Sequence, residues 1–435
     1  MKELLNIFVL LFLLLSISSF PISILRFKSL FNVKKIYLFD FLSINFLINT
    51  ILLLFLSFTK FNFQVYLLAL ISCSIIFNIY QFIKYEPKYD FLKKELIFFL
   101  IITLIISIKL SANPTLSWDG LENWYFKAQN FFYGLNFFNL NETLGINYYP
   151  HLGTYLWGIF WKSSFFEYEY YGRIIYVYIF VLSIFTISDL IKDNHLIKPV
   201  FTSLIVIICY DEFLFGGYQD VLLFSFLIFT SKYLYFYLKT SDNKYLLLSF
   251  LYLNLLPWIK NEGYIFVIIA IVSLSCFINL LKKREIILFM ILSILLILLK
   301  FIIFNNYLSI NPTHGANLKF NYEINGFIEF LKIFLPGLIV AIFKYKIWIL
   351  IIMGFVFIFR LKQVNKKNIF YKFLKINFVI YFLSLVFIYY DFLDEPRGLY
   401  WWIHTTLDRF LYSISGSYII LLVLILEQNK HYFKK

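Results

Sequence analysis

The sequence has 435 residues and a net charge of +14, with 61% hydrophobic residues, only 15% charged residues and a mean hydropathy of +0.79. A soluble domain of this length needs far less apolar surface, so the composition excludes a soluble globular protein and predicts an all-α, polytopic membrane protein. The apolar runs are continuous rather than alternating, which favours transmembrane helices over a membrane β-barrel.

In chain order, the apolar runs predict about 13 transmembrane helices. These runs cover residues 4–25, 37–58, 64–84, 95–111, 172–191, 197–210, 220–239, 245–257, 263–281, 285–304, 346–360, 371–390 and 409–427. One further apolar stretch, 326–343, is ambiguous because it carries Glu329, Lys332 and Pro336.

The basic residues predict the orientation of these helices, because the cytoplasmic loops of membrane proteins carry an excess of Lys and Arg. We compare two arrangements, in which 326–343 either lies along the membrane surface or crosses it. With the N-terminus outside and 326–343 on the surface, most of the 39 Lys and Arg residues fall in segments predicted to be cytoplasmic, namely 26–36, 84–94, 192–198, 239–244, 282–285, 360–375 and the tail after 427. If 326–343 crossed, the basic stretch RLKQVNKKN and the basic tail would lie outside. We predict the first arrangement, which explains the positive charge without a nucleic-acid partner.

This arrangement predicts a single membrane domain, 1–435, with its polar chemistry on the outer face. The N-terminal helices, 1–110, precede a long outer loop, 111–171, which carries short interfacial helices; the remaining helices and outer loops occupy 172–435. Most of the 25 Asp and Glu residues fall on the outer face.

The stretch SWDGLENWYFKAQNFF begins the long outer loop directly after an apolar run. Asp119 and Glu122 are three residues apart and share a face if the segment is helical. A carboxylate at the membrane boundary suits a general base that acts on a hydroxyl. The alternative is that Asp119 caps an interfacial helix, while Trp118 and Trp124 belong to an aromatic belt at the membrane surface.

Two more polar clusters fall on the predicted outer face. Asp220 begins an apolar run after YQD, where a carboxylate is costly unless it faces a cavity or a partner; the alternative is a helix N-cap. In PWIKNEG, Lys260 is a candidate to bind a phosphate, and the alternative is an internal ion pair between Lys260 and Glu262.

The last cluster, WWIHTTLDRF, precedes the final apolar run. Asp408 and Arg409 stand at its start and His404 lies one turn earlier. Arg409 can bind a phosphate through two hydrogen bonds, and the alternative is an interfacial arginine paired with Asp408. The histidines lack zinc-ligand spacing and no Gly-rich phosphate loop is present, so the sequence predicts no metal centre.

Together these motifs resemble bacterial integral-membrane glycosyltransferases of the C-type (GT-C) superfold, related to protein O-mannosyltransferases and aminoarabinose transferases. The resemblance rests on WDGLENWYFKA, NYYPHLGTYL, GYQDVLLF with KNEG, and HTTLDRFL, in that order from 111 to 425. It implies a GT-C-like fold in the inner (plasma) membrane, with the active face toward the periplasm.

The resemblance also implies an activity, transfer of a sugar from a polyprenyl-phosphate donor to a lipid- or glycan-linked acceptor. Asp119 would remove the proton of the acceptor hydroxyl, and the anomeric carbon would be inverted. Arg409, Lys260 and Lys127 would stabilise the leaving phosphate, and Asp220 and Glu262 would orient these cations or bind sugar hydroxyls. Glu122, His404 and Asp408 complete the predicted substrate-binding set. No cofactor is predicted; dependence on a divalent metal stays open, although the sequence offers no dedicated set of ligands for one.

Two other classes of function stay open. A transporter or lipid flippase also contains charges inside the membrane, but these are expected near its middle rather than at the ends of helices. A polysaccharide polymerase or ligase of another membrane fold is expected to use arginines of the outer loops, and only Arg173, Arg397 and Arg409 are candidates here.

Overall fold

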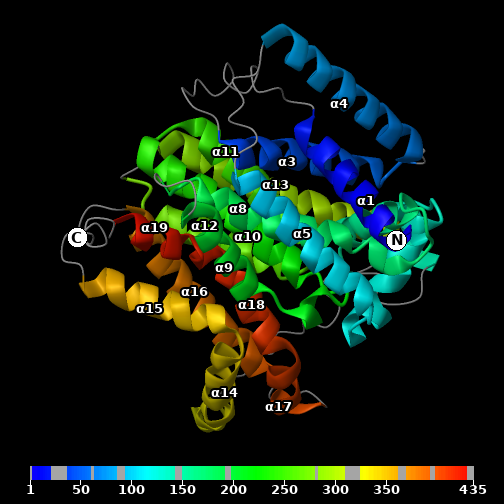
Figure 1. Ribbon diagram of the computed structural model, residues 1–435. Coiled ribbons are helices and arrows are strands. Elements are labelled where there is room, and N and C mark those ends of the chain that lie inside the picture. Colours follow the sequence, from blue (N-terminus) through cyan, green and yellow to red (C-terminus); the bar gives the residue numbers. More distant parts are fainter. Residues whose placement is uncertain are drawn as a thin grey trace. The chain divides into compact units, whose positions relative to one another are not determined.

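The computed structural model describes residues 2–20, 37–59, 63–85, 94–142, 149–191, 197–279, 283–308, 324–360, 369–391 and 397–428, and every regular element within these ranges is a helix (Figure 1). The prediction of an all-α protein is therefore confirmed. The chain divides into two compact units, Met1–Ser225 and Phe226–Lys435, with the boundary inside one helix, α10. That the two units form a single membrane domain stays a prediction.

The first unit is built around α8 (Ile174–Ser188), every residue of which is buried. Its long helices α1, α3 and α5, together with α9, pack on α8. The helices of this unit are α1 (Lys2–Ser19), α3 (Leu38–Leu56), α4 (Phe63–Tyr85), α5 (Lys94–Ala112), α6 (Phe126–Phe132), α7 (Leu152–Lys162), α8, α9 (Ile197–Cys209) and the first turns of α10 (Asp220–Thr240).

Short helical segments fill the predicted outer loop, as the sequence analysis expects. They are η1 (Gly120–Tyr125), α6, η2 (Phe137–Glu142), α7 and η3 (Glu169–Tyr171), and η4 (Glu212–Phe215) follows α9. Helices α6 and α7 pack closely, since Gly158 lies against the Ala128 carbonyl oxygen, 2.4 Å from where a Cβ of Gly158 would stand. The loop is thus a folded layer rather than an extended connection.

The second unit consists of the rest of α10 and of α11 (Asn243–Ile259), α12 (Gly263–Ser275), α13 (Lys283–Leu308), α14 (Ile324–Lys344), α15 (Lys346–Arg360), α16 (Ile369–Asp391), α17 (Gly398–Trp402), η5 (Ile403–Leu407), α18 (Asp408–Tyr418) and α19 (Ile420–Gln428). Helix α12 packs on α11, α13 and α16, and α14 packs on α15, α17, η5 and α18. The segment 398–428 is an almost continuous helix interrupted by the π-helical turn η5.

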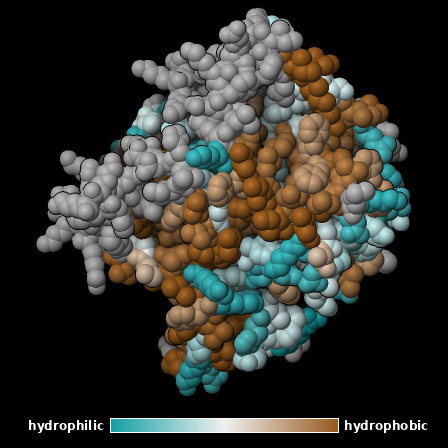
Figure 2. Space-filling view, viewed as in Figure 1, coloured by the Kyte–Doolittle hydropathy of each residue, from teal (hydrophilic) through white to brown (hydrophobic). Residues whose placement is uncertain are grey.

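Nine helices among the described residues are long and apolar enough to cross a membrane. They are Lys2–Ser19, Leu38–Leu56, Lys94–Ala112, Glu169–Ser188, Asp220–Thr240, Lys283–Asn306, Gly326–Lys344, Ile369–Asp391 and Gly398–Ile425. Apolar side chains cover much of the face in Figure 2, and α13 buries only 22% of its most apolar window, so its surface suits contact with lipid. The membrane class is supported, and the count of 13 stays a prediction because several predicted spans form helices of 17 residues or fewer.

The predicted orientation depends largely on segments outside the described residues, including 26–36, 361–368 and 429–435. Helix α14, which corresponds to the ambiguous stretch 326–343, is among the nine candidates for crossing, so length and apolarity alone do not place it on the surface.

Candidate active site

In the first unit, the start of the WDG motif is fixed to the loop that precedes α10. The backbone amide of Ser117 donates to the Gly216 carbonyl oxygen at 2.8 Å, and the Ser117 hydroxyl donates to the Phe213 carbonyl oxygen at 2.8 Å. These two bonds join the segment that carries Asp119 to the segment that carries Asp220.

Glycines allow this contact. A Cβ on Gly120 would stand 2.2 Å from the Gly216 carbonyl oxygen, and a Cβ on Gly217 would stand 3.0 Å from the Gly120 Cα. Gly217 also has a φ of +97°, a conformation that residues with a Cβ rarely adopt. The WDG and GGYQD motifs are therefore held in contact through their backbones.

The fully buried Arg173 binds to both of these segments. Its guanidinium forms two hydrogen bonds with the Glu169 carboxylate, at 2.6 and 3.1 Å. Its remaining donors reach backbone carbonyls, which belong to Pro114, Thr115 and Phe215. All five N–H donors are thus used within the protein. Arg173 positions the chain on either side of the contact and is not available to a substrate.

Asp119 directly precedes η1, at its N-cap position. Its backbone is helical, with φ −62° and ψ −34°, and its side chain makes no capping hydrogen bond to η1. The position fits the capping alternative, but the hydrogen bond of a cap is not formed. Asp119 is half-buried and Glu122 is exposed. The turn that follows Asp119 and contains Glu122 is π-helical, with i→i+5 bonds that widen it relative to an α-helix.

Lys127 is fully buried, and its amine donates to the Tyr149 carbonyl oxygen at 2.6 Å between the rings of Trp124 and Tyr149. Burial holds the pKa of this amine well below its usual value of 10.5. A substrate phosphate does not reach a fully buried amine, so Lys127 ties the outer-loop helix to the YPH segment instead of serving the predicted phosphate.

Asp220, at the first position of α10, is also fully buried. Its neighbour Gln219 exchanges hydrogen bonds with the Tyr176 hydroxyl, at 3.0 and 3.3 Å. The Gln219 amide fills the space in which a Cβ of Gly153 would stand. The YQD motif is thus anchored in the interior of the unit.

The second unit brings the KNEG and HTTLDR motifs together. The Lys260 amine lies 2.9 Å from the Glu262 carboxylate and 5.7 Å from the centre of the Phe410 ring. The Lys260–Glu262 ion pair considered in the sequence analysis is therefore present, which leaves Lys260 with a carboxylate partner and little exposure. Of the same turn, Asn261 Oδ1 and Glu262 Oε2 have no hydrogen-bond partner among the described residues.

Tyr389, near the end of α16, connects these motifs. Its hydroxyl shares a hydrogen bond of 2.6 Å with the Thr406 hydroxyl. It lies within electrostatic range of Glu262, Asp408 and Arg409. Glu262 from one segment and Thr406, Asp408 and Arg409 from another thus interact with this buried phenol.

Asp408 forms an ion pair with Lys344, not with the Arg409 side chain. The Asp408 carboxylate also accepts a hydrogen bond from the Arg409 backbone amide, at 2.8 Å. The Arg409 guanidinium donates to the Thr405 carbonyl oxygen at 3.0 Å. The alternative considered in the sequence analysis, an ion pair between the side chains of Arg409 and Asp408, is therefore not among these contacts. His404 is exposed, and its ring packs on Tyr400 at 4.1 Å between centroids.

Both motif segments contain a π-helical turn, and Gly120–Tyr125 and Ile403–Leu407 are the only two such turns in the described part of the chain. At the second, the hydroxyls of Thr405 and Thr406 bond to the carbonyls of Trp401 and Trp402, which helps to loosen the α-helical ladder. π-Helical turns occur frequently at functional sites. Their positions here coincide with two of the motifs chosen from sequence alone.

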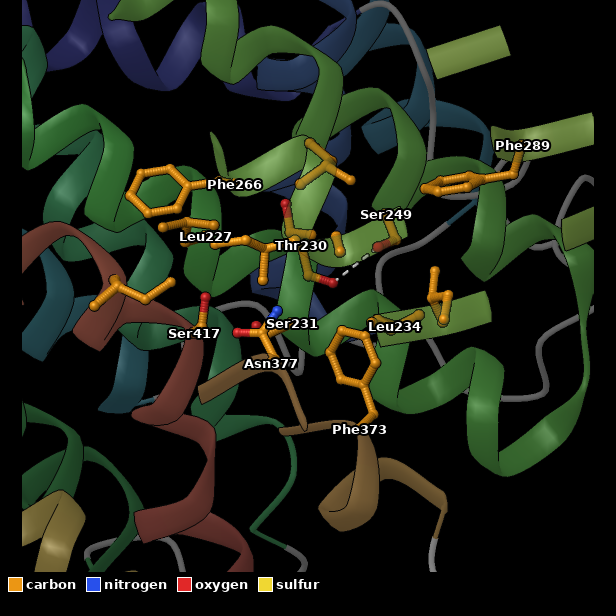
Figure 3. Close-up of a pocket in the computed structure, with 15 residues that line it drawn as sticks. Leu227, Thr230, Ser231, Leu234, Ser249, Phe266, Phe289, Phe373, Asn377 and Ser417 are labelled. Carbon is orange, nitrogen blue, oxygen red and sulfur yellow. Dashed lines mark hydrogen bonds between the residues drawn. The ribbon is translucent and has the colours of Figure 1, made fainter. Parts of the chain in front are cut away.

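A small cavity in the second unit lies apart from these motif residues. Its volume is about 20 Å³, enough for about one water molecule. Hydroxyl and amide groups of Thr230, Ser231, Ser249, Asn377 and Ser417 line it together with apolar side chains, and the Ser249 hydroxyl bonds to the Thr230 carbonyl (Figure 3). This space is too small for a sugar or a lipid chain.

Among the residues that the structure describes, no group of three or more His, Cys, Asp and Glu side chains is placed to hold a metal ion. No family model, curated protein or solved structure matches the chain. The resemblance to glycosyltransferases therefore rests on the sequence motifs alone.

Sequence reasoning missed Lys344, Tyr389 and Thr406, and it considered Arg173 only as a candidate for another function. Lys344 ends the apolar stretch that was ambiguous, and no local pattern pairs it with Asp408. Tyr389 is one of many tyrosines in an aromatic-rich chain, so its position carried no signal. The Thr-Thr pair before LDR was the one local feature that pointed to an irregular helical turn.

Proposed function

We propose that this chain is a membrane glycosyltransferase that moves a sugar from a polyprenyl-phosphate donor to an acceptor hydroxyl on the outer face of the plasma membrane. The observation that carries the proposal is the coincidence of two π-helical turns with the two motifs that contain Asp119 and Arg409. The proposal includes the GT-C-like fold, about 13 membrane spans and the predicted orientation.

In the proposed reaction, Asp119 removes the proton of the acceptor hydroxyl. The oxygen then attacks the anomeric carbon of the sugar, the bond to the phosphate oxygen breaks, and the configuration inverts. A half-buried carboxylate on a helical turn fixed by backbone contacts is suited to this role, since a general base needs a defined position.

The leaving group is a lipid phosphate, which needs stabilisation of its charge. Arg409 is our candidate for this role, because a guanidinium matches the oxygens of a phosphate and the residue follows the HTTLD stretch at the start of α18. The buried acceptors Asn261 Oδ1 and Glu262 Oε2 suit the hydroxyl donors of a sugar better than a phosphate, which offers only acceptors. Lys260 pairs with the other carboxylate oxygen of Glu262.

The contacts of α14 support the predicted orientation. Phe327 and Phe330, near its start, pack on Tyr390 at the end of α16, and Lys344, at its end, pairs with Asp408 at the start of α18. The segment 391–409, which joins α16 to α18, is predicted to lie outside. A helix whose two ends both contact residues predicted to lie at the outer face of the membrane is expected to lie along the membrane surface.

Two measurements test the proposal. Envelope glycans from cells without this protein, compared by mass spectrometry with those of complemented cells, should lack one sugar. The purified chain in detergent, given a lipid extract that contains polyprenyl-linked sugars, should form a glycosylated acceptor. Unchanged glycans, together with no product in detergent, would contradict a glycosyltransferase.

A transporter or lipid flippase is the second candidate. Lys232 favours it, because this fully buried lysine lies in the middle of α10, within a candidate membrane span. A flippase needs a sealed membrane and makes no new bond, so product formation in detergent separates the two functions. The polymerase or ligase alternative is weakened, because it relies on arginines of the outer loops. The Arg173 guanidinium forms all its hydrogen bonds within the protein, and Arg397 packs on Trp401.

A further inference from the structure

The small cavity of the second unit lies between helices that are candidates to cross the membrane. Its polar lining comes from Thr230 and Ser231 on α10, Ser249 on α11, Asn377 on α16 and Ser417 on α18 (Figure 3). Of these helices, α10, α16 and α18 belong to candidate membrane spans. All 15 residues that line the cavity are buried, so it is closed to solvent and to lipid.

Three of these polar groups have no hydrogen-bond partner among the described residues. They are the hydroxyls of Ser231 and Ser417 and the side-chain amide nitrogen of Asn377. Ser231 is 4% exposed, Asn377 is 5% exposed and Ser417 is 6% exposed. Within a membrane, neither bulk solvent nor lipid can satisfy a buried polar group, and a group left unsatisfied is costly. The three groups therefore call for a ligand inside the cavity.

The hydrogen bonds that the lining already forms specify a ligand that both donates and accepts. Asn377 Oδ1 accepts from the Tyr418 hydroxyl at 2.9 Å, so the amide offers N–H donors to the cavity. The hydroxyls of Thr230 and Ser249 donate to the carbonyls of Phe226 and Thr230, at 2.8 and 3.0 Å, so these hydroxyls offer lone pairs. A metal cation cannot accept from the amide, and a simple anion cannot donate to the hydroxyl oxygens. Water does both.

The size of the cavity agrees with this chemistry. Its volume is about 20 Å³, and a buried water molecule needs roughly 10–15 Å³ and two to four polar partners. The cavity also lies beside an interruption of the last candidate span. Helix α18 ends at Tyr418, directly after Ser417, and α19 begins at Ile420. Ordered water is one of the means by which interrupted membrane helices satisfy their polar groups.

We infer that this cavity binds one water molecule, which joins α10, α16 and α18. The Asn377 amide donates to the water, and the hydroxyls of Ser231 and Ser417, each able to donate or accept, connect it to the other two helices. Because α18 begins at Asp408 and Arg409, the water helps to hold the helix that carries these two residues. The site does not depend on the proposed sugar transfer, and a closed cavity of this size is not a path for a transported substrate.

The sign of a serine-to-alanine effect tests the inference. If water is bound, Ser231→Ala removes a hydrogen bond and should lower the midpoint of thermal unfolding of the full chain in detergent by about 2–4 °C. If the cavity is dry, the same substitution removes a costly unsatisfied hydroxyl, so the midpoint should stay unchanged or rise. Ser417→Ala should behave as Ser231→Ala does. An unchanged or higher midpoint in either variant would overturn the inference.

A double-mutant cycle shows whether one ligand links the two serines. Ser231→Ala combined with Ser417→Ala should lower the midpoint by less than the sum of the single effects, because loss of the first partner already weakens binding of the water. Ser415→Ala is the matched control on α18. The Ser415 hydroxyl is buried but donates to the Tyr412 carbonyl oxygen at 2.6 Å, and Ser415 does not line the cavity. Its effect should add to that of Ser231→Ala. Additive effects in both cycles would contradict a shared water molecule.

A map of the full chain in a lipid nanodisc, obtained by electron cryo-microscopy, locates the ligand directly. We expect a density peak within hydrogen-bond distance of Ser231, Asn377 and Ser417 in the wild type, and a weaker peak or none in the double alanine variant. A wild-type map without this peak would overturn the inference. Replacement of Na⁺ and K⁺ by choline at constant ionic strength should leave the wild-type midpoint unchanged. A fall in the midpoint that Ser231→Ala abolishes would replace the water with a monovalent cation.

Discussion

The backbone amide of Ser117 donates a hydrogen bond of 2.8 Å to the carbonyl oxygen of Gly216, and this contact joins two distant motifs within the first unit. Asp119 follows Ser117 by two residues, and Asp220 follows Gly216 by four. The position of the candidate base is therefore set by backbone contacts, which are sensitive to small steric changes.

Gly120→Ala tests this contact. The added Cβ would stand 2.2 Å from the Gly216 carbonyl oxygen, so the two segments must separate. We expect a loss of about 1–3 kcal/mol in stability and a large loss of activity in the folded fraction. Thermal unfolding in detergent and transfer activity measure the two effects. Leu121→Ala, at the exposed next residue, is the control, and wild-type behaviour of Gly120→Ala would show that the contact is not required.

Arg173→Met tests the buried anchor. It removes five hydrogen bonds and leaves the Glu169 carboxylate without its cation, and breaking a buried pair in this way costs about 3–5 kcal/mol. Arg173→Lys should recover only part of this loss because it lacks the planar fork. The midpoint of thermal unfolding reports the change. Arg397→Met, at an exposed arginine, should be nearly silent; an equal effect at both positions would contradict the anchoring role.

The helices were largely predictable, and the contacts between them were not. The run 95–111 corresponds to α5 at Lys94–Ala112, because continuous apolar stretches of this length leave few alternatives to a helix. By contrast, nothing local in the sequence indicates that Arg173 binds the carbonyls of Pro114 and Phe215, since backbone acceptors are present at every residue.

The candidate site was predictable as a set of motifs rather than as a set of contacts. The sequence placed Asp408 beside Arg409, but its ion-pair partner is Lys344, far away along the chain. The π-helical turn at Gly120–Tyr125 also has no signature in apolar spacing, so it was not predicted.

Lys127 predicts a pH dependence of stability. Burial lowers the pKa of its amine in the folded state, so between that lowered pKa and 10.5 the unfolded chain binds more protons than the folded chain. Stability should therefore rise with pH through this window, and the cost of burying the charge is fully present below it. Unfolding temperatures from pH 7 upward should rise for wild type relative to Lys127→Met. Lys162→Met, at an exposed lysine, should keep the wild-type slope; a wild-type slope in Lys127→Met would contradict the assignment.

Thr405 and Thr406 provide a matched pair at the second π-helical turn. Thr406→Val removes the 2.6 Å hydrogen bond to the buried Tyr389 hydroxyl, and an unsatisfied buried group costs about 1–3 kcal/mol. Thr405→Val removes only a bond to a backbone carbonyl at an exposed position, so it should have little effect. Transfer activity per folded protein should fall for Thr406→Val alone. Equal loss in both variants would show that Tyr389 does not organise the site.

The most direct test of the central claim is glycan transfer in membranes by Asp119→Asn, normalised to folded protein and compared with wild type and Glu122→Gln. Asn keeps the size of the side chain but cannot accept the proton at neutral pH. If Asp119 is the base, Asp119→Asn should lose about 10²–10⁴-fold in rate at unchanged stability, while Glu122→Gln keeps most of its activity. Retained activity in Asp119→Asn with loss in Glu122→Gln would move the base to Glu122, and retained activity in both would contradict a catalytic role for this stretch.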